Sequence, residues 1–205
     1  MTGFKKARLA AGKFTLIEML VVISIIAVLA SILLPALNAA KNRAQGAVCV
    51  NKLKQLILSE LEYADDNDGR LPSPWDGKDN WSRVLGKAGY APEWSPTKNF
   101  SHFHCPCWPP LEWSNFYGDT YAMAFESDNG DYEYQRLFGL PTNWPVVSDS
   151  ISLTTMKQYY YIGKDTKQNR IHLRHFGKGN VVFPDGHVSG VEGNDVTAMG
   201  FYYYK

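Results

Sequence analysis

The chain opens with an apolar segment that is interrupted once. Between Phe14 and Leu34, Glu18 is the only charged residue. About 20 predominantly apolar residues are enough for a helix to cross a membrane. The pattern therefore predicts a transmembrane helix over residues 14–37. Pro35 lies near its end and predicts either a kink, because proline removes a helical hydrogen bond, or simply the point where the chain leaves the membrane.

The next segment alternates with the period of a helix. Its apolar residues recur at spacings of three and four and form one stripe: Val50, Leu53, Ile57, Leu61 and Ala64. This periodicity predicts that the helix extends over 38–66 and covers a sheet with its apolar side. Gly69 and Pro72 are stop signals. The acidic run at 65–68 lacks the ligand spacing of an EF-hand loop, so a turn is preferred over a calcium site.

Residues 67–205 predict a globular, loop-rich β domain. Residues 72–118 are rich in proline and tryptophan and indicate irregular connections. Short aromatic and β-branched runs then predict strands at Tyr121–Phe125, Tyr132–Phe138, Tyr159–Ile162, Arg170–His175, Val181–Phe183, His187–Val191 and Phe201–Tyr204. A helix followed by strands is an α+β pattern, with the long helix packed on an antiparallel sheet.

The distribution of charge predicts how the chain is oriented in the membrane. Four basic residues precede the apolar segment: Lys5, Lys6, Arg8 and Lys13. Basic flanks stay in the cytoplasm, so we expect the N-terminus inside and the globular part outside. The net charge of +1 gives no basic footprint for nucleic acid. A cleavable signal ending near Val28-Leu29-Ala30 is the alternative, but the apolar run is longer than a signal core and contains Glu18.

The stretch "FTLIE" followed by an apolar helix resembles the N-terminus of type IV prepilins and of the pseudopilins of type II secretion systems. The resemblance implies that 1–13 is a leader peptide, that a prepilin peptidase cuts between Lys13 and Phe14, and that Phe14 is then N-methylated. It also implies that Glu18 pairs with the terminal amine of a neighbouring subunit during assembly. The family usually has glycine before the cut, where this chain has Lys13.

The same resemblance suggests partners and a cysteine pairing. It implies other pilin-like subunits and the inner membrane as partners, with no cofactor and no metal. Disulfides persist outside the cytoplasm. "HCP" resembles a Cys-Pro of related sequences, which favours a bond between Cys49 and Cys105, with Cys107 as the alternative. A metal site built on the two Cys-Pro-Cys thiols with His102 and His104 is a less favoured interpretation.

The segment "RHFGKGNVVFPDGHVSGV" resembles the C-terminal signature of a prepilin-like group in which His175 is followed, nine residues later, by Asp185 and Gly186. Its glycines and its Pro-Asp-Gly predict two tight turns. We expect a structural role, with His175 hydrogen-bonded to the Asp185 turn. The alternative is a metal or catalytic site that also uses His172 and His187.

These observations favour a structural subunit of a type IV pilus or a type II secretion-like filament, and not an enzyme. Two other functions remain open at this point. One is a membrane-tethered binding protein that does not polymerise and presents its tryptophans to a ligand such as polysaccharide. The other is an exported enzyme that uses the C-terminal histidines.

Overall fold

The computed structural model describes residues 15–92, 103–107, 121–125, 135–164 and 167–205. The chain divides into two compact units, residues 1–41 and 42–205. The first helix, α1 (Leu16–Asp66), contributes its beginning to one unit and its end to the other. Each unit is described on its own below.

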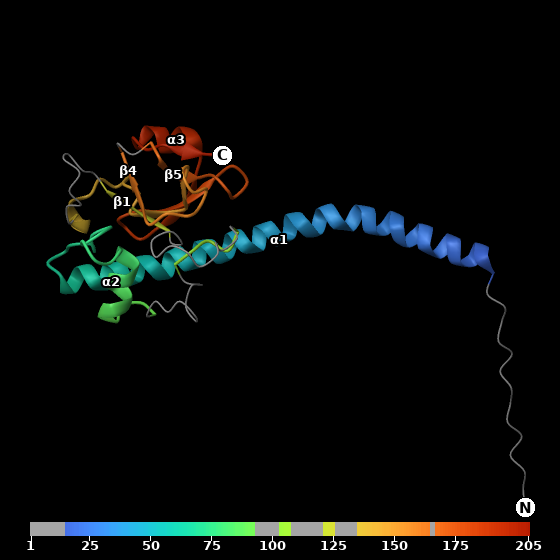
Figure 1. Cartoon of the computed structure of the whole chain (residues 1–205), viewed down its shortest axis with the longest axis horizontal. Coiled ribbons are helices and arrows are strands. Elements are labelled where there is room, and N and C mark those ends of the chain that lie inside the picture. Colours follow the sequence, from blue (N-terminus) through green and yellow to red (C-terminus); the bar gives the residue numbers. More distant parts are fainter. Residues whose placement is uncertain (1–14, 93–102, 108–120, 126–134, 165–166) are drawn as a thin grey trace, which may run out of the picture. The chain divides into compact units, whose positions relative to one another are not determined.

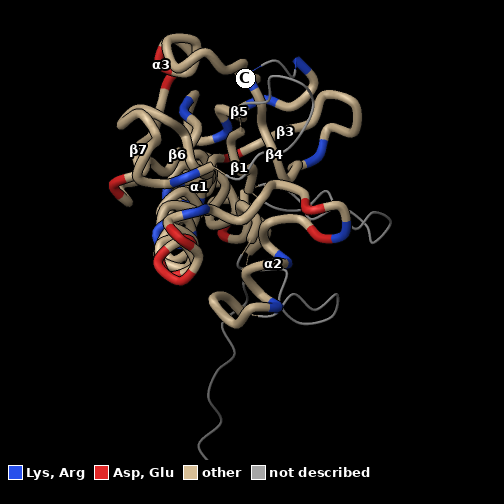
Figure 2. Tube along the Cα trace, turned by 90° about the vertical axis from the view of Figure 1, so that its left-hand side faces the viewer, with Lys and Arg blue, Asp and Glu red and all other residues tan. Residues whose placement is uncertain are grey.

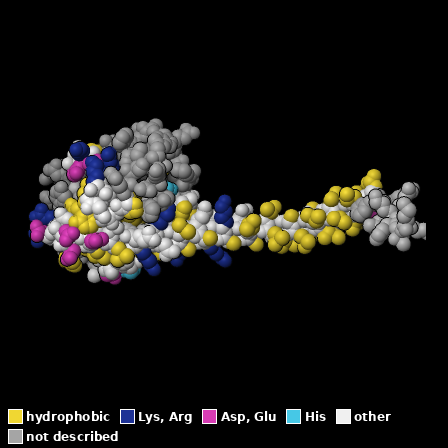
Figure 3. Space-filling model, turned by 90° about the horizontal axis from the view of Figure 1, so that it is seen from below, with side chains coloured by type: hydrophobic (Ala, Val, Ile, Leu, Met, Phe, Trp, Pro, Cys, Tyr) yellow, Lys and Arg dark blue, Asp and Glu magenta, His cyan; other side chains and the backbone are white. Residues whose placement is uncertain are grey.

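In the first unit, α1 exposes nearly all of its apolar side chains. Leucine, isoleucine and valine residues from Leu16 to Leu37 are each about half exposed or more. Figure 3 shows them as an almost continuous hydrophobic surface along the helix. The Ser24 and Ser31 hydroxyls donate to carbonyls three residues earlier, so they are satisfied without water. The helix is long and apolar enough to cross a membrane, and Pro35 lies within it.

In the second unit, the end of α1 buries the predicted stripe. Leu53, Ile57 and Ala64 are fully or almost fully buried, whereas Val50 and Leu61 are half-buried. The helix ends at Asp66, as the stop signals predict. Gly69, with φ of 73°, donates its amide to the carbonyl of Ala64 at 2.8 Å and closes the last turn.

The strands form two sheets. The larger has the order β4-β1-β2-β6-β7, and the smaller has the order β3-β5-β8. Their bounds are β1 (Ala122–Phe125), β2 (Val147–Ser148), β3 (Ser150–Ser152), β4 (Tyr161–Gly163), β5 (Asn169–His172), β6 (Gly179–Val182), β7 (Val188–Val191) and β8 (Tyr203–Tyr204). The predicted α+β fold, with a long N-terminal helix, is confirmed.

The sheets are not purely antiparallel, in contrast to the expectation. β4 pairs with β1 in parallel, and β8 pairs with β5 in parallel. Parallel neighbours need a crossover of a dozen or more residues. The long connections that precede β4 and β8 supply that length, which the local strand pattern did not reveal.

Three short helical elements interrupt the predicted loops and strands. α2 (Trp81–Ala88) lies inside 72–118, so the prediction of irregular structure there is wrong for these residues. Its signals are local: the Asn80 side chain accepts the amide of Arg83, and Gly89 ends the helix with φ of 89°. The described part of the predicted strand 132–138 contains the start of a 3₁₀ turn (Leu137–Gly139) instead. α3 (Gly193–Ala198) was not predicted.

One hydrophobic core joins these elements. It contains Leu53 of α1, Trp81 of α2, Val181 of the larger sheet and Ile171 of the smaller sheet. Figures 1 and 2 place α2 and α3 on opposite sides of the strands. In the view of Figure 2, acidic and basic residues are intermixed around the described part of this unit.

Candidate functional site

Glu18 takes part in a capping box at the start of α1. The Thr15 amide and hydroxyl both donate to Glu18 Oε2, at 2.8 and 2.6 Å, and the Glu18 amide donates back to Thr15 Oγ1 at 3.3 Å. A threonine followed three residues later by a glutamate satisfies amides that a helix start leaves unpaired. The carboxylate of Glu18 is therefore fixed at the positive end of the helix dipole.

A second group of residues, three of them singled out from the sequence, meets inside the globular unit. Cys49, Cys105, Asp149 and His175 each direct one potential ligand atom into a common space, and these atoms all lie within 4.8 Å of one another. Three of the four residues are buried and His175 is nearly so. We call these four residues the Cys-Asp-His cluster. They come from four separate parts of the chain.

Cys49 reaches the cluster because it lies on the buried face of α1, one turn before Leu53. Its sulfur receives two hydrogen bonds, from the Tyr121 hydroxyl at 3.3 Å and from the Asn180 side-chain amide at 3.2 Å. It also lies 3.4 Å from Asp149 Oδ1. These two donors fix the position of the Cys49 sulfur.

Cys105 is held by its backbone. The Gln158 side chain accepts the Cys105 amide and donates to the Cys105 carbonyl, both at 3.1 Å. Because Gln158 is itself buried, this double contact fixes the position of the Cys105 thiol. The sulfur lies 3.3 Å from His175 Nε2.

Asp149 lies where the chain passes from one sheet to the other, between β2 and β3. Its amide donates to the Asn180 carbonyl in the larger sheet, and its carbonyl accepts the His172 amide in the smaller sheet. The buried carboxylate accepts the backbone amide of Asn180 at 2.9 Å and lies 3.2 Å from His175 Nε2. The position is thus set by both sheets.

His175 is presented by a two-residue turn. Its amide and carbonyl pair with those of Lys178, and the central residues Phe176 and Gly177 have φ of 55° and 80°. Positive φ at both central residues is typical of the type I′ turn, which asparagine and glycine favour. The turn directs Nε2 toward Asp149 and Cys105, while Nδ1 faces Cys107 Sγ at 3.7 Å.

The electrostatics of the cluster favour a charged network. The hydrogen bond from Cys49 lowers the pKa of Cys105, and the contact with His175 adds to this, so that the pKa is about 6 despite burial. Burial raises the pKa of Cys49 far above its ordinary value. Burial would also lower the pKa of His175, but Asp149 and Cys105 outweigh it and raise that pKa to about 9. His175 and Arg174 hold the pKa of Asp149 below its usual range, although burial opposes them.

The structure separates the two halves of the C-terminal signature. Asp185 accepts the amide of His187 and pairs with its ring on the surface, so the expected bond between His175 and the Asp185 turn is wrong. Gly186, with φ of 84°, confirms the predicted turn between β6 and β7. His172 is buried against Tyr204, outside the cluster. The alternative metal or catalytic site grouped His172 with His175, Asp185 and His187. The structure does not bring these four residues together.

Several predictions about the cysteines and the leader stand as they were. Cys49, Cys105 and Cys107 are free thiols here, so a disulfide between the first two remains a prediction that their proximity permits. Lys13, Phe14 and His102 lie outside the described residues. Asp149 was missed by the sequence analysis, because an aspartate within "VVSDSIS" matches no ligand motif.

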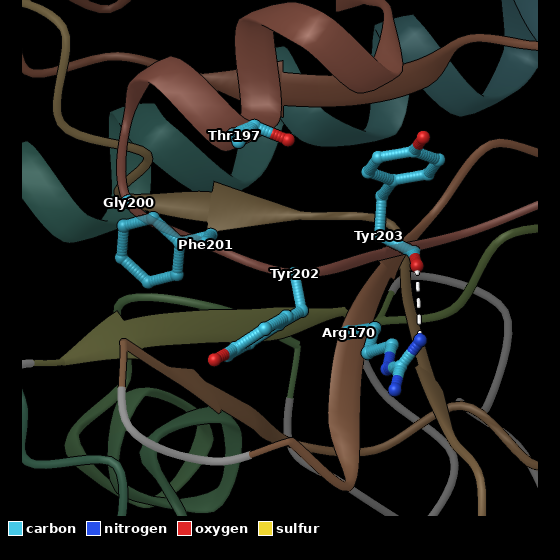
Figure 4. A pocket seen from close by; sticks show the side chains of 6 residues that line it. All are labelled: Arg170, Thr197, Gly200, Phe201, Tyr202 and Tyr203. Atoms are coloured by element: carbon cyan, nitrogen blue, oxygen red, sulfur yellow. Dashed lines mark hydrogen bonds between the residues drawn. The ribbon is translucent and has the colours of Figure 1, made fainter.

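A surface pocket elsewhere on the globular unit has a different character. It is lined by Arg170, Thr197, Gly200, Phe201, Tyr202 and Tyr203. Figure 4 shows two tyrosine rings and the Arg170 guanidinium, which donates to the Tyr203 carbonyl at 3.4 Å. These six lining residues contain no pair of a nucleophile and a general base, so we assign this pocket no catalytic role.

Comparison with known proteins gives one informative similarity. No family model and no solved structure matches the chain. Over 58 residues the chain is 46% identical to the type IV wide pilus major component PilA4 of Thermus thermophilus. The match covers 28% of this chain and 44% of that protein, so the chain spans less than half the length of its relative. The similarity is therefore to a segment of a pilus component, and it accompanies a helix that is long and apolar enough to cross a membrane.

Proposed function

We propose that this protein is a structural subunit, a pilin or a pseudopilin, of a type IV pilus or a type II secretion-like filament. The observation that carries the proposal is the exposed apolar surface of α1 between Leu16 and Leu37. An apolar surface of this extent needs lipid or other apolar helices around it. A membrane before assembly, and neighbouring subunits after it, provide both surroundings in turn.

The proposal includes processing and an assembly contact. A prepilin peptidase at the inner membrane would remove residues 1–13, cut between Lys13 and Phe14 and methylate Phe14. The globular unit would lie outside the cytoplasm. Glu18 would accept the terminal amine of a neighbouring subunit, which leaves two charges paired in an apolar environment instead of one charge unpaired. The similarity to a pilus component supports this assignment.

The first experiment is to determine the mature N-terminus by mass spectrometry of the protein extracted from its native membranes. An N-methylated Phe14 is the expected result. A chain that begins near Ser31 would indicate ordinary secretion, and an intact Met1 would indicate a tethered protein that does not enter a filament. Either of these two results would contradict the proposal.

A pair of variants separates the two roles of Glu18. Glu18→Ala removes both the cap and the assembly charge, whereas Thr15→Ala weakens the cap and keeps the carboxylate. We expect both variants to insert into the membrane, and only Glu18→Ala to be lost from filaments when each is co-expressed with a tagged wild type. Equal incorporation of Glu18→Ala and wild type would exclude Glu18 as the assembly charge.

A further inference from the structure

We propose that the Cys-Asp-His cluster binds one zinc ion, with Cys49, Cys105, Asp149 and His175 as its four protein ligands. The residues offer two sulfurs, one imidazole nitrogen and one carboxylate oxygen to one point. This donor set excludes hard cations such as calcium and magnesium, which take oxygen ligands. Soft sulfur combined with nitrogen and oxygen in a group of four is typical of tetrahedral zinc.

The distances between the ligand atoms fit such a site. Tetrahedral zinc, with bonds of about 2.3 Å to sulfur and about 2.0 Å to nitrogen or oxygen, spaces a nitrogen and an oxygen about 3.3 Å apart, and a sulfur and either of them about 3.5 Å apart. His175 Nε2 and Asp149 Oδ2 are 3.2 Å apart. Cys105 Sγ lies 3.3 Å from the same nitrogen, and Cys49 Sγ lies 3.4 Å from Oδ1, the other oxygen of the Asp149 carboxylate. With one ligand atom taken from each residue, all four atoms lie within 4.8 Å of one another.

The surrounding residues act on the ligands as outer-shell groups do at metal sites. Tyr121 and Asn180 donate to the sulfur of Cys49. The backbone amide of Asn180 also orients the Asp149 carboxylate. Cys107 faces Nδ1 of His175, so that a proton on Nδ1 directed at this sulfur leaves the lone pair of Nε2 for the metal. Cys107 is therefore a positioning residue and not a ligand.

The charges around the cluster also support a bound zinc ion. Two thiolates and a carboxylate around a divalent ion leave a single net negative charge, which a buried site must offset. Lys52 interacts electrostatically with Cys49 and Cys105, and Arg174 interacts with Cys105 and Asp149. The ion would join α1, the 103–107 segment and the two sheets at one point. Because all four positions are filled by nearly buried protein ligands, the site is structural and not catalytic.

The test is the zinc content of the full-length protein, purified in detergent with a non-thiol reductant and without chelator. We expect about one zinc per chain in the wild type. The Cys49→Ser, Cys105→Ser and His175→Ala variants should lose most of it. His187→Ala is the matched control, because His187 is an exposed histidine outside the cluster, and this variant should keep its zinc. Unchanged zinc in His175→Ala would overturn the proposal, because the ion would then be bound elsewhere.

A second measurement does not depend on the variants folding. Chelator-treated wild type is titrated with Co²⁺, which reports thiolate ligands by an intense charge-transfer absorption and tetrahedral geometry by its visible bands. We expect both signals, and stoichiometric Zn²⁺ should abolish them. If protein extracted without reductant instead has an intact mass two hydrogens below the reduced value and yields a Cys49–Cys105 peptide, the disulfide holds this position and the zinc proposal is wrong.

Discussion

Glu60 provides a sharp test of how the end of α1 packs within the globular unit. Its side chain is fully buried, and neither carboxyl oxygen has a hydrogen-bond partner within the described part of the chain. Burial raises its pKa well above the usual value for a glutamate. The folded protein therefore keeps the proton on Glu60 at a pH at which the unfolded chain has released it.

The sign of the effect on stability follows from proton linkage. Below the unfolded pKa, near 4.3, both states hold the proton and Glu60 adds no pH dependence. Above that value the unfolded state binds fewer protons than the folded state, so stability falls as the pH rises toward the folded pKa. The loss is at most about 1.4 kcal/mol per pH unit. For a unit of this size that amounts to about 3–5 °C in the unfolding midpoint.

The perturbation is Glu60→Gln, which keeps the shape and removes the titration. The assay is thermal unfolding of the full chain in detergent, followed by tryptophan fluorescence at several pH values from 4.5 to 7. All six tryptophans lie between Trp75 and Trp144, so the signal comes from the globular unit. Glu62→Gln changes an exposed residue on the same helix and is the control.

We expect Glu60→Gln to become more stable than wild type by an amount that grows as the pH rises, because all other titrations cancel in the difference. The Glu62→Gln difference should stay flat over the same range. The reasoning would be refuted by a Glu60→Gln difference that is constant, or by one that shrinks with rising pH. The second outcome would mean that Glu60 is ionised and paired in the folded protein.

Two further predictions concern the core. Leu53→Ala removes a fully buried side chain and should destabilise the globular unit by about 2–5 kcal/mol. Leu58→Ala, on the exposed side of α1, should change the stability by less than about 0.5 kcal/mol. Denaturant unfolding compares the two variants, and equal effects would contradict the burial of the Leu53 side of α1. Gly179→Ala places a methyl group 2.8 Å from the Ile171 side chain and 3.1 Å from the carbonyl oxygen of His172, so it should lower the stability of the fold by about 1–3 kcal/mol. Gly139→Ala meets nothing within 4 Å and should be close to neutral in the same thermal-unfolding assay, so a similar midpoint for both variants would count against the close approach of the two sheets.

The sequence predicts those parts of the fold that are encoded by local patterns. The helix to Asp66 follows from one apolar stripe and its stop signals, and most of the described strands overlap predicted runs, although no strand was predicted at β2 or β3. α2 was not predicted, because eight residues give too few turns for a periodic signal and its cap at Asn80 lies in a proline-rich segment. The parallel pairing of β4 with β1, and of β8 with β5, depends on the crossover connections and not on the sequences of the strands themselves.

The sequence predicts less of the candidate site than of the fold. Cys49 and Cys105 were singled out as partners in a disulfide, and His175 as part of the C-terminal signature with the Asp185 turn. Their convergence depends on Asp149, which no motif marks, and on a turn that places Nε2 of His175 on the side of Asp149. Residues far apart in the sequence meet only through the arrangement of α1 and the two sheets, and single-sequence patterns carry no information about that arrangement.

The capping box at Thr15 and Glu18 has a consequence for how subunits would meet. A free glutamate side chain loses up to about 2 kcal/mol of rotational freedom when a contact immobilises it. Here two donors from Thr15 already hold Oε2 in a single subunit. A carboxylate has about four lone-pair positions, so it keeps room for another donor. In the proposed filament, the arriving amine would find an acceptor that is already preorganised, and the entropic penalty of forming that contact would fall mainly on the arriving chain.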